Sequence, residues 1–233
     1  GVRATVDPLL PKLFSVKPKA DFEIRLVEPF REASSSSGSY QGPPQDGSRP
    51  GIFYVNAYDL KARPRYAMES LYLHEATPGH HFQIALQREL TELPAFRRFG
   101  GETAYNEGWG LYAESLGKEL GVYTDPAMYF GALSAELWRS IRLVTDTGIH
   151  AKGWTRQQAI DYLASPTALS IHERTTETDR YIAWPGQALS YKTGELKIRE
   201  LRARAERALG PRFDVRRFHD ELLGHGPVPL PVL

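Results

Sequence analysis

The sequence predicts a mainly α-helical fold with a small β element, and two contrasts along the chain support this prediction. Before residue 60, one short segment alternates polar and apolar residues as strands do, a second segment is a further strand candidate, and a long Ser/Gly/Pro-rich stretch separates them. After Pro64, apolar residues recur at helical spacing, and helix-capping residues precede several of these segments. We therefore expect an N-terminal segment over residues 1–50, with a strand and a flexible loop, and a helical domain over residues 51–233.

The N-terminal part is expected to begin with a short amphipathic helix over residues 9–15. The stretch DFEIRLVEP, from Asp21, alternates polar and apolar residues and is predicted to be a strand. The next stretch, REASSSSGSYQGPPQDGSRPG, has little to bury and is predicted to be a flexible loop. IFYVNAYD, from Ile52, is a second strand candidate. We expect the two strands to pair as a hairpin or to form a sheet edge.

Helical segments are predicted to follow Pro64, and several of their ends carry clear signals. Asp125 before Pro126 is a typical N-cap before a first helical residue. Thr155 and Gln158 have the spacing of a capping box. The expected segments are 66–88 with an interruption at Pro78-Gly79, 103–120 ended by Gly121, 125–150, 155–164, 170–182, 187–209 and 215–223.

Composition limits the classes of function. A net charge of +1 with 24% charged residues gives no reason to expect a nucleic acid or an anionic membrane as partner. The chain has no cysteine, so any metal must be held by histidine and carboxylate side chains. An apolar run of about 18 residues, as a membrane span needs, is absent from the sequence.

The start of the sequence suggests a fragment. It lacks an initiator methionine and the basic-then-apolar order of a signal peptide, so we expect a C-terminal piece of a longer protein. The missing N-terminal half of that protein is then an expected partner of this chain. The sequence assigns no compartment, and export would depend on a signal in the missing part.

The stretch YLHEATPGHHFQ, over residues 72–83, holds three histidines and a glutamate. His74 and Glu75 look like the start of H-E-x-x-H, the helical motif of zinc peptidases, but position 78 is a proline. In an unbroken helix His80 would lie about 240° around the axis from His74. His81 would return to the same face about 10 Å further along. A regular helix therefore does not build a site here.

Pro78 and Gly79 change this expectation. Proline removes a backbone donor and clashes with the carbonyl four residues earlier, and glycine permits unusual dihedrals. We expect a widened or bulged helical turn that brings His80 round to meet His74. Glu75 would then serve as general base for an attacking water. The plainer alternative is a helix kink with surface histidines.

A third ligand is available in YNEGWGLYAESLG. Glu107 and Glu114 are seven residues apart and so share one face of a helix. Two carboxylates amid apolar residues are costly to bury without a cation. One could bind a metal while the other accepts a hydrogen bond from a ligating histidine. The alternative is an ordinary solvated helix face.

Several motifs together resemble a large bacterial family of proteins of unknown function that is placed among the zincin-like metallopeptidases. The motifs are HEATPGHH, EGWGLYAE, DTGIHAKGWT, RYIAWPGQALSYKTG and FHDELLGHGPVPL. The resemblance extends over most of the chain from about Gly51, and family members are typically much longer. It implies a helical zincin-like architecture for residues 51–233, and it places this chain in the C-terminal portion.

A more distant likeness implies roles for single residues. Thermostable zinc carboxypeptidases and angiotensin-converting-enzyme-like peptidases have H-E-x-G-H and then a helix with two glutamates seven apart. That likeness implies zinc ligands, a general base and an outer carboxylate. The ligands are His74, His80 and Glu107, the base is Glu75, and the outer carboxylate is Glu114. The longer spacing between the histidines departs from that pattern and leaves His81 as a substitute for His80.

Those relatives also use a late tyrosine to stabilise the oxyanion, and Tyr191 in SYKTG is the candidate, with Tyr181 behind it. His150 and Arg180 are candidates for binding a substrate carbonyl or carboxylate. The alternative for Tyr191 is simple packing. His150 could instead cap a helix C-terminus, and Arg180 could pair with a neighbouring acid.

The expected function is zinc-dependent hydrolysis of peptide bonds, in the manner of a carboxypeptidase or dipeptidase. One rival is a non-catalytic metal-binding or peptide-binding remnant of a peptidase fold. Another keeps the zinc hydrolase but changes the bond to a different amide or an ester. Glu75 separates the first two hypotheses, because a purely structural zinc site does not require a carboxylate beside the ligand.

Overall fold

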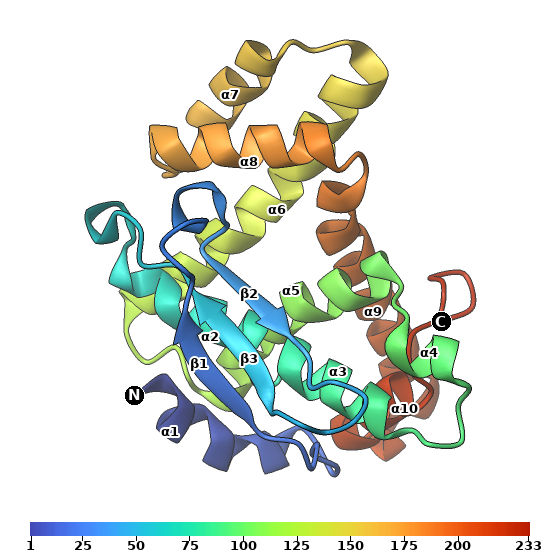
Figure 1. Cartoon of the computed structure of the whole chain (residues 1–233). Helices are drawn as coiled ribbons and strands as arrows, with labels where there is room; N and C mark the ends of the chain where they lie inside the picture. The colour runs from blue at the N-terminus through green and yellow to red at the C-terminus, as the bar shows by residue number, and fades with distance from the viewer.

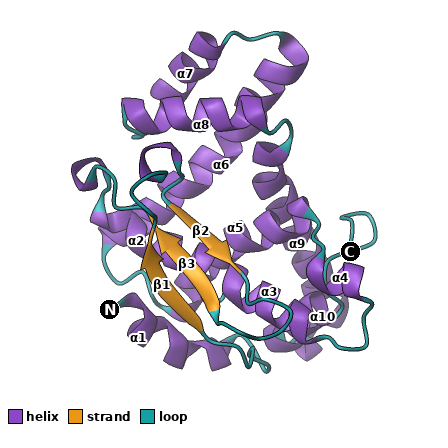
Figure 2. Cartoon of the chain, viewed as in Figure 1, coloured by secondary structure: helices purple, strands orange, loops and turns teal.

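A computed structural model describes residues 1–233, with the side chain of residue 62 excepted. It is mainly helical, with one small sheet on the front of the view in Figures 1 and 2. The helices are α1 Val2–Val6, α2 Met68–Glu75, α3 His80–Glu89, α4 Ala95–Phe99, α5 Thr103–Leu120, α6 Pro126–Lys152, α7 Arg156–Ala164, α8 Ile171–Ala183, α9 Gln187–Leu209 and α10 Val215–Gly224. The strands are β1 Phe22–Leu26, β2 Gly38–Gln41 and β3 Gly51–Val55, and short 3-10 turns include η1 Asp7–Lys12.

Both predicted strands exist, but their pairing differs from a hairpin. The strand order is β1-β3-β2, and β1 runs parallel to β3 while β2 runs antiparallel to it. The chain can therefore connect β1 to β3 only by a crossover. That crossover contains β2, which lies inside the stretch predicted to be a flexible loop. The sheet thus joins strands from both sides of residue 50.

The N-terminal helix is earlier than predicted. Helical turns occupy α1 and η1, from Val2 to Lys12, rather than residues 9–15. The buried residues explain the shift, because Val6, Leu10, Leu13 and Phe14 follow one another at helical spacing and all reach the core. The apolar face therefore begins before Leu9.

The later helices are confirmed closely. Asp125 accepts a hydrogen bond from the backbone N–H of Ala127 at the start of α6, and both α7 and α8 begin with complete capping boxes. Gly121 ends α5 in a left-handed conformation with a φ of 81°. The predicted interruption at Pro78-Gly79 is confirmed, because it separates the segment 66–88 into two helices, α2 and α3. The short helix α4 was not predicted.

Helix α5 lies at the centre of the molecule. It packs along α9 and against α2 and α3, while the sheet packs on α2 and α3 from the other side. Figure 1 shows α6 running from behind the sheet to the pair α7 and α8 at the far end. Within the described residues, none of the helices combines the length and apolar character required to cross a membrane.

Candidate metal centre

His74 and His80 lie on either side of a break between two helices. His74 is in the last turn of α2, and His80 is the first residue of α3. A Cβ on Gly79 would lie 1.9 Å from the carbonyl oxygen of His74, so only glycine permits this close approach. The indole Nε1 of Trp109 donates to the carbonyl oxygen of Pro78 at 2.8 Å. We expected a bulged helical turn, but the helix is interrupted completely: residues 76–79 belong to neither α2 nor α3.

The N-terminal segment holds this break in place. Thr77, inside the turn, donates from Oγ1 to Oδ1 of Asp7 at 2.8 Å. The hydroxyls of Tyr72 and Thr77 are 3.0 Å apart, so they also share a hydrogen bond. Asp7 belongs to η1, far from the turn in sequence. The conformation between the two histidines therefore depends on a hydrogen bond to a residue 70 positions earlier in the chain.

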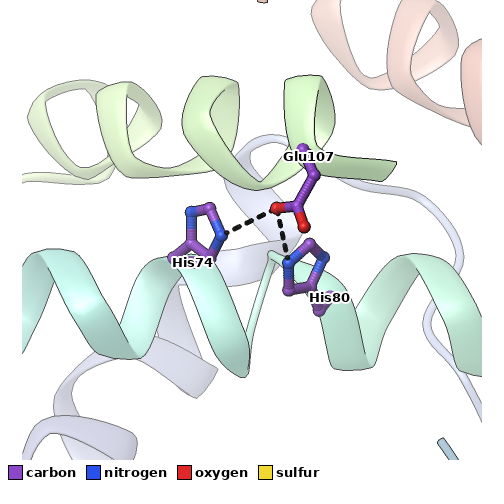
Figure 3. A group of neighbouring side chains, drawn as sticks. All are labelled: His74, His80 and Glu107. Atoms are coloured by element: carbon purple, nitrogen blue, oxygen red, sulfur yellow. Dashed lines mark ion pairs between the residues drawn. The ribbon is translucent and has the colours of Figure 1, made fainter. Parts of the chain in front are cut away.

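Three ligand atoms converge at this break (Figure 3). Oε2 of Glu107, from α5, lies 3.5 Å from Nε2 of His74 and 3.4 Å from Nε2 of His80. All three residues offer a ligand atom within 4.8 Å of the others. Ligands bound tetrahedrally to one zinc ion at about 2.0–2.1 Å would be about 3.3 Å apart. The spacing of the donor atoms therefore fits a metal ion.

The chemistry of the donor set fits as well. Oε2 of Glu107 is buried, and among the described residues it has no hydrogen-bond donor. A buried carboxylate oxygen without a donor is costly unless a cation meets it. The side chains of Glu107 and His80 keep 17% and 11% of their surface exposed, whereas His74 keeps 3%. The cluster is therefore buried on one side and reachable from solvent on the other.

His74 lies between two carboxylates of α5. Its Nε2 faces Glu107, and its Nδ1 is 2.8 Å from Oε1 of Glu114. Gly110 makes room for the ring, because a Cβ there would lie 2.7 Å from Cε1 of the imidazole. The seven-residue spacing of the glutamates and the glycine between them thus form one slot for His74.

Two further side chains hold Glu114. Ser70, on α2, donates a short hydrogen bond to its Oε2. Arg139, on α6, lies 3.2 Å from its Oε1. Together they leave Glu114 as an ionised acceptor for the Nδ1–H of His74 and so fix which ring nitrogen faces Glu107.

These contacts shift the protonation equilibria. Burial alone would lower the pKa of His74, but the carboxylates of Glu107 and Glu114 raise that pKa to about 9. Burial opposes ionisation of Glu107, yet the imidazoles of His74 and His80 hold its pKa well below the usual range. The site is therefore arranged around a positive charge on the histidine side and a negative charge on Glu107.

Glu75 follows His74 directly and lies beside the cluster. It is buried, and its side chain packs near Gly38 of β2. Burial raises the pKa of its carboxyl, while the neighbouring charges of His74 and His80 act in the opposite direction. A carboxyl with a raised pKa next to a cation site is suited to accept and return a proton.

His81 points away from the cluster. Its Nδ1 is 2.9 Å from the hydroxyl of Tyr40 on β2, and its ring lies 4.6 Å from that of Phe22 on β1. Burial lowers its pKa to about 4. The structure thus brings His80 together with His74 and Glu107, and it places His81 against the sheet.

The remaining candidates lie at different distances from the cluster. The ring of Tyr191 is stacked on that of His74, with 5.9 Å between centroids and 22° between planes. Arg180 ion-pairs with Glu177 at 2.7 Å. Nε2 of His150 is 2.9 Å from the carbonyl oxygen of Tyr181. Arg180 thus pairs with a neighbouring acid, and His150 contacts a carbonyl in the last turn of α8, as the alternatives without a substrate role predict. The substrate-binding roles of both residues stay predictions.

The sequence did not single out several residues that build this site. Arg139 and Ser70 left no recognisable signal, because they act only across helices. Gln187 donates from Nε2 to Oε1 of Glu107 at 3.0 Å and to the hydroxyl of Tyr191 at 3.2 Å. Its place four residues before Tyr191 on the same helix face was the one signal available.

The fold and the site together define a mainly helical protein with a small mixed sheet and a buried His/His/Glu cluster able to hold a metal ion. The chain belongs to the bacterial family of proteins of unknown function designated DUF885, whose model matches residues 2–233.

Two solved structures are similar to this chain. One is a "putative lipoprotein" from Colwellia psychrerythraea, 44% identical with a TM-score of 0.97, and the similarity covers 100% of this chain. The other, a "putative lipoprotein of unknown function" from Shewanella oneidensis, is 24% identical with a TM-score of 0.80 over 99% of this chain and so shows the fold alone. The chain spans only 40% and 43% of those two proteins. A comparison with curated proteins gave no match.

Proposed function

We propose that this chain is the zinc-binding part of a hydrolase that cleaves peptide bonds, with a zincin-like architecture. One observation carries the proposal: Nε2 of His74, Nε2 of His80 and Oε2 of Glu107 converge. Glu75 follows His74 in the chain and is buried, and the charges of His74 and His80 act on the pKa of its carboxyl. Two histidines and one carboxylate form a typical ligand set of catalytic zinc, which leaves a further position open. Partial exposure of His80 and Glu107 supports an open position over a closed structural site.

Each residue has a distinct task in this proposal. His74, His80 and Glu107 would hold the zinc ion. When bound, zinc would supply Lewis acidity toward a carbonyl oxygen and toward water. Glu75 takes the proton of the attacking water and returns it to the leaving amine. Tyr191 donates its hydroxyl hydrogen to the oxyanion that develops on the substrate.

The length of the two structural relatives supports a larger protein. Because it spans 40% of the Colwellia protein, we propose that it is the C-terminal portion of a similar, longer chain whose remainder completes the substrate cleft. The description of the Colwellia neighbour as a "putative lipoprotein" favours export of that longer protein.

The test combines metal content with turnover. Glu107→Ala is expected to lose zinc after dialysis, because the carboxylate that faces both histidines is gone. Glu75→Gln is expected to keep near-stoichiometric zinc and to lose peptide hydrolysis by about a thousandfold, because an amide cannot accept the proton. Glu200→Gln, an exposed glutamate on α9, is the matched control.

Two outcomes would contradict the proposal. Wild-type protein that binds no zinc after zinc is added back would remove the metal centre. Full hydrolysis by Glu75→Gln would remove the general base. Zinc binding without hydrolysis of any peptide in a library would instead support the non-catalytic remnant.

A further inference from the structure

We infer that Gln187 is a positioning residue that orients both Glu107 and Tyr191, and the inference rests on the function proposed above. The side-chain amide of Gln187 contacts three groups. Its Nε2 lies 3.0 Å from Oε1 of Glu107 and 3.2 Å from the hydroxyl of Tyr191, and its Oε1 accepts from Nη1 of Arg180. One amide thus joins a proposed metal ligand to the proposed oxyanion donor.

The neighbours of this amide fix which end is oxygen and which is nitrogen. Arg180 can only donate hydrogen bonds, so it must face the amide oxygen. The ionised carboxylate of Glu107 can only accept, so it must face the amide nitrogen. In a flipped amide the nitrogen would face the donor of Arg180 and the oxygen would face the carboxylate of Glu107, so neither hydrogen bond could form. The orientation of Gln187 therefore follows from its partners.

That orientation has a consequence for Glu107. The amide holds Oε1 of the carboxylate, which leaves Oε2 directed at the two histidines. Arg180 is itself anchored, because Glu177 accepts from its Nε at 3.2 Å and from its Nη2 at 2.7 Å. A chain of three side chains thus fixes the rotation of the carboxylate about its own axis.

It has a second consequence for Tyr191. The nitrogen of Gln187 has two hydrogens, one for Glu107 and one for the oxygen of Tyr191. Because Tyr191 accepts from Gln187, its own hydroxyl hydrogen must point away from that amide. The phenol is therefore set to donate to a third group, which is what an oxyanion requires.

The backbone under Gln187 is fixed as well. Gln187 is the first residue of α9, after Gly186 in a left-handed conformation with a φ of 81°. The buried carboxylate of Asp146, on α6, accepts from the N–H of Gly186 at 3.1 Å. The start of α9 is thereby attached to α6, so the amide of Gln187 starts from a defined position.

The first arm of the test measures zinc affinity, by competition with a chromophoric chelator. Gln187→Met keeps the length of the side chain and removes its donors, so it should weaken zinc binding about 10- to 100-fold, as loss of an outer partner of a ligand does. Ser190→Ala is the matched control and should bind as wild type, because the hydroxyl of Ser190, in the first turn of α9, donates to the carbonyl oxygen of Gly186.

A second substitution separates positioning from simple packing. Gln187→Glu keeps the size of the side chain but replaces the donor that faces Glu107 with an acceptor, so zinc should bind more weakly than in Gln187→Met. Zinc affinity in Gln187→Glu equal to that of wild type would overturn the positioning role.

The second arm measures hydrolysis at saturating zinc. Gln187→Met should lower kcat in the wild-type background and have a smaller effect in Tyr191→Phe, because the hydroxyl that it orients is then absent. Equal effects in both backgrounds would overturn the part of the inference that concerns Tyr191. Zinc affinity of Gln187→Met equal to that of Ser190→Ala would overturn the part that concerns Glu107, while the Glu75→Gln result would leave the proposed function standing.

If wild-type protein binds zinc and hydrolyses no peptide, the proposed function fails and the part about Tyr191 fails with it. Zinc affinity then still decides whether Gln187 positions Glu107.

Discussion

His74 and His219 are both almost fully buried, with 2% and 0% of their surface exposed, and both lie against α5. Their partners differ in charge. His74 lies between the carboxylates of Glu107 and Glu114, and its pKa is raised to about 9. Nδ1 of His219 donates to the carbonyl oxygen of Leu13 at 2.8 Å, and burial lowers its pKa to about 4. Burial alone therefore does not determine what a histidine does.

The two histidines mark two faces of one helix. Glu107, Gly110 and Glu114 form the face of α5 that lies against His74 and carries the proposed metal site. Trp109 and Tyr112 form another face, where the Tyr112 hydroxyl is 2.9 Å from Nε2 of His219. The hydroxyl also accepts from Arg202, so its hydrogen goes to His219 and keeps that ring neutral. One face is arranged to bind a charge, and the other joins α10 and the N-terminal segment to the core.

The largest expected effect separates the two faces by metal binding. His74→Gln should weaken zinc binding about a thousandfold or more, since one of three ligands is lost. His219→Gln should leave zinc affinity within about twofold of wild type and lower the free energy of unfolding instead. Chelator competition and urea titration on both variants measure this, and zinc loss in His219→Gln would erase the distinction.

The next effect concerns pH. The folded-state pKa of His219, about 4, lies below the unfolded value of about 6.5, so the unfolded chain takes up the proton first. The contribution of this histidine is therefore fully present above about pH 6.5 and falls by up to about 3 kcal/mol as the pH drops from about 6.5 to about 4. Urea titrations of metal-free protein at pH 7 and pH 4 should show this loss in wild type and a smaller one in His219→Gln. The lowered pKa of His81 causes the same loss of stability in wild type and in His219→Gln. Identical total losses in the two proteins would therefore contradict the pKa assigned to His219.

The smallest of these effects sharpens the role of Glu114. Glu114→Gln keeps the shape of the side chain but removes the charge that holds Nδ1–H of His74, so zinc affinity should fall about 10- to 100-fold. Glu119→Gln, five residues after Glu114 on the same helix and paired with Arg202, is the control for charge removal on α5. Unchanged affinity in Glu114→Gln would mean that His74 is oriented by packing against Gly110 and Tyr191 alone.

Local signals predicted the helices well and the contacts between distant segments poorly. The capping box at Thr155 and the stop at Gly121 act within a few residues, so the sequence shows them directly. The parallel pairing of β1 with β3 depends on the whole crossover, and nothing local encodes it.

The same division applies to the site. The residue types predicted a metal site of histidine and glutamate, and the likeness to zinc peptidases implied His74, His80 and Glu107, which the structure brings together. The hydrogen bond from Thr77 to Asp7 and the ion pair of Arg139 with Glu114 join segments far apart in sequence, and those were found only in the structure.

Gly110 has a consequence for how substitution data on this family should be interpreted. It carries no functional group, yet any side chain at this position would occupy the space of the His74 imidazole. In a saturation mutagenesis scan scored by turnover, Gly110 should therefore be as intolerant as a ligand. A search for distant members, or a design that transplants this centre, needs the pattern Glu-x-x-Gly-x-x-x-Glu on the helix opposite the histidines as much as it needs the histidines themselves.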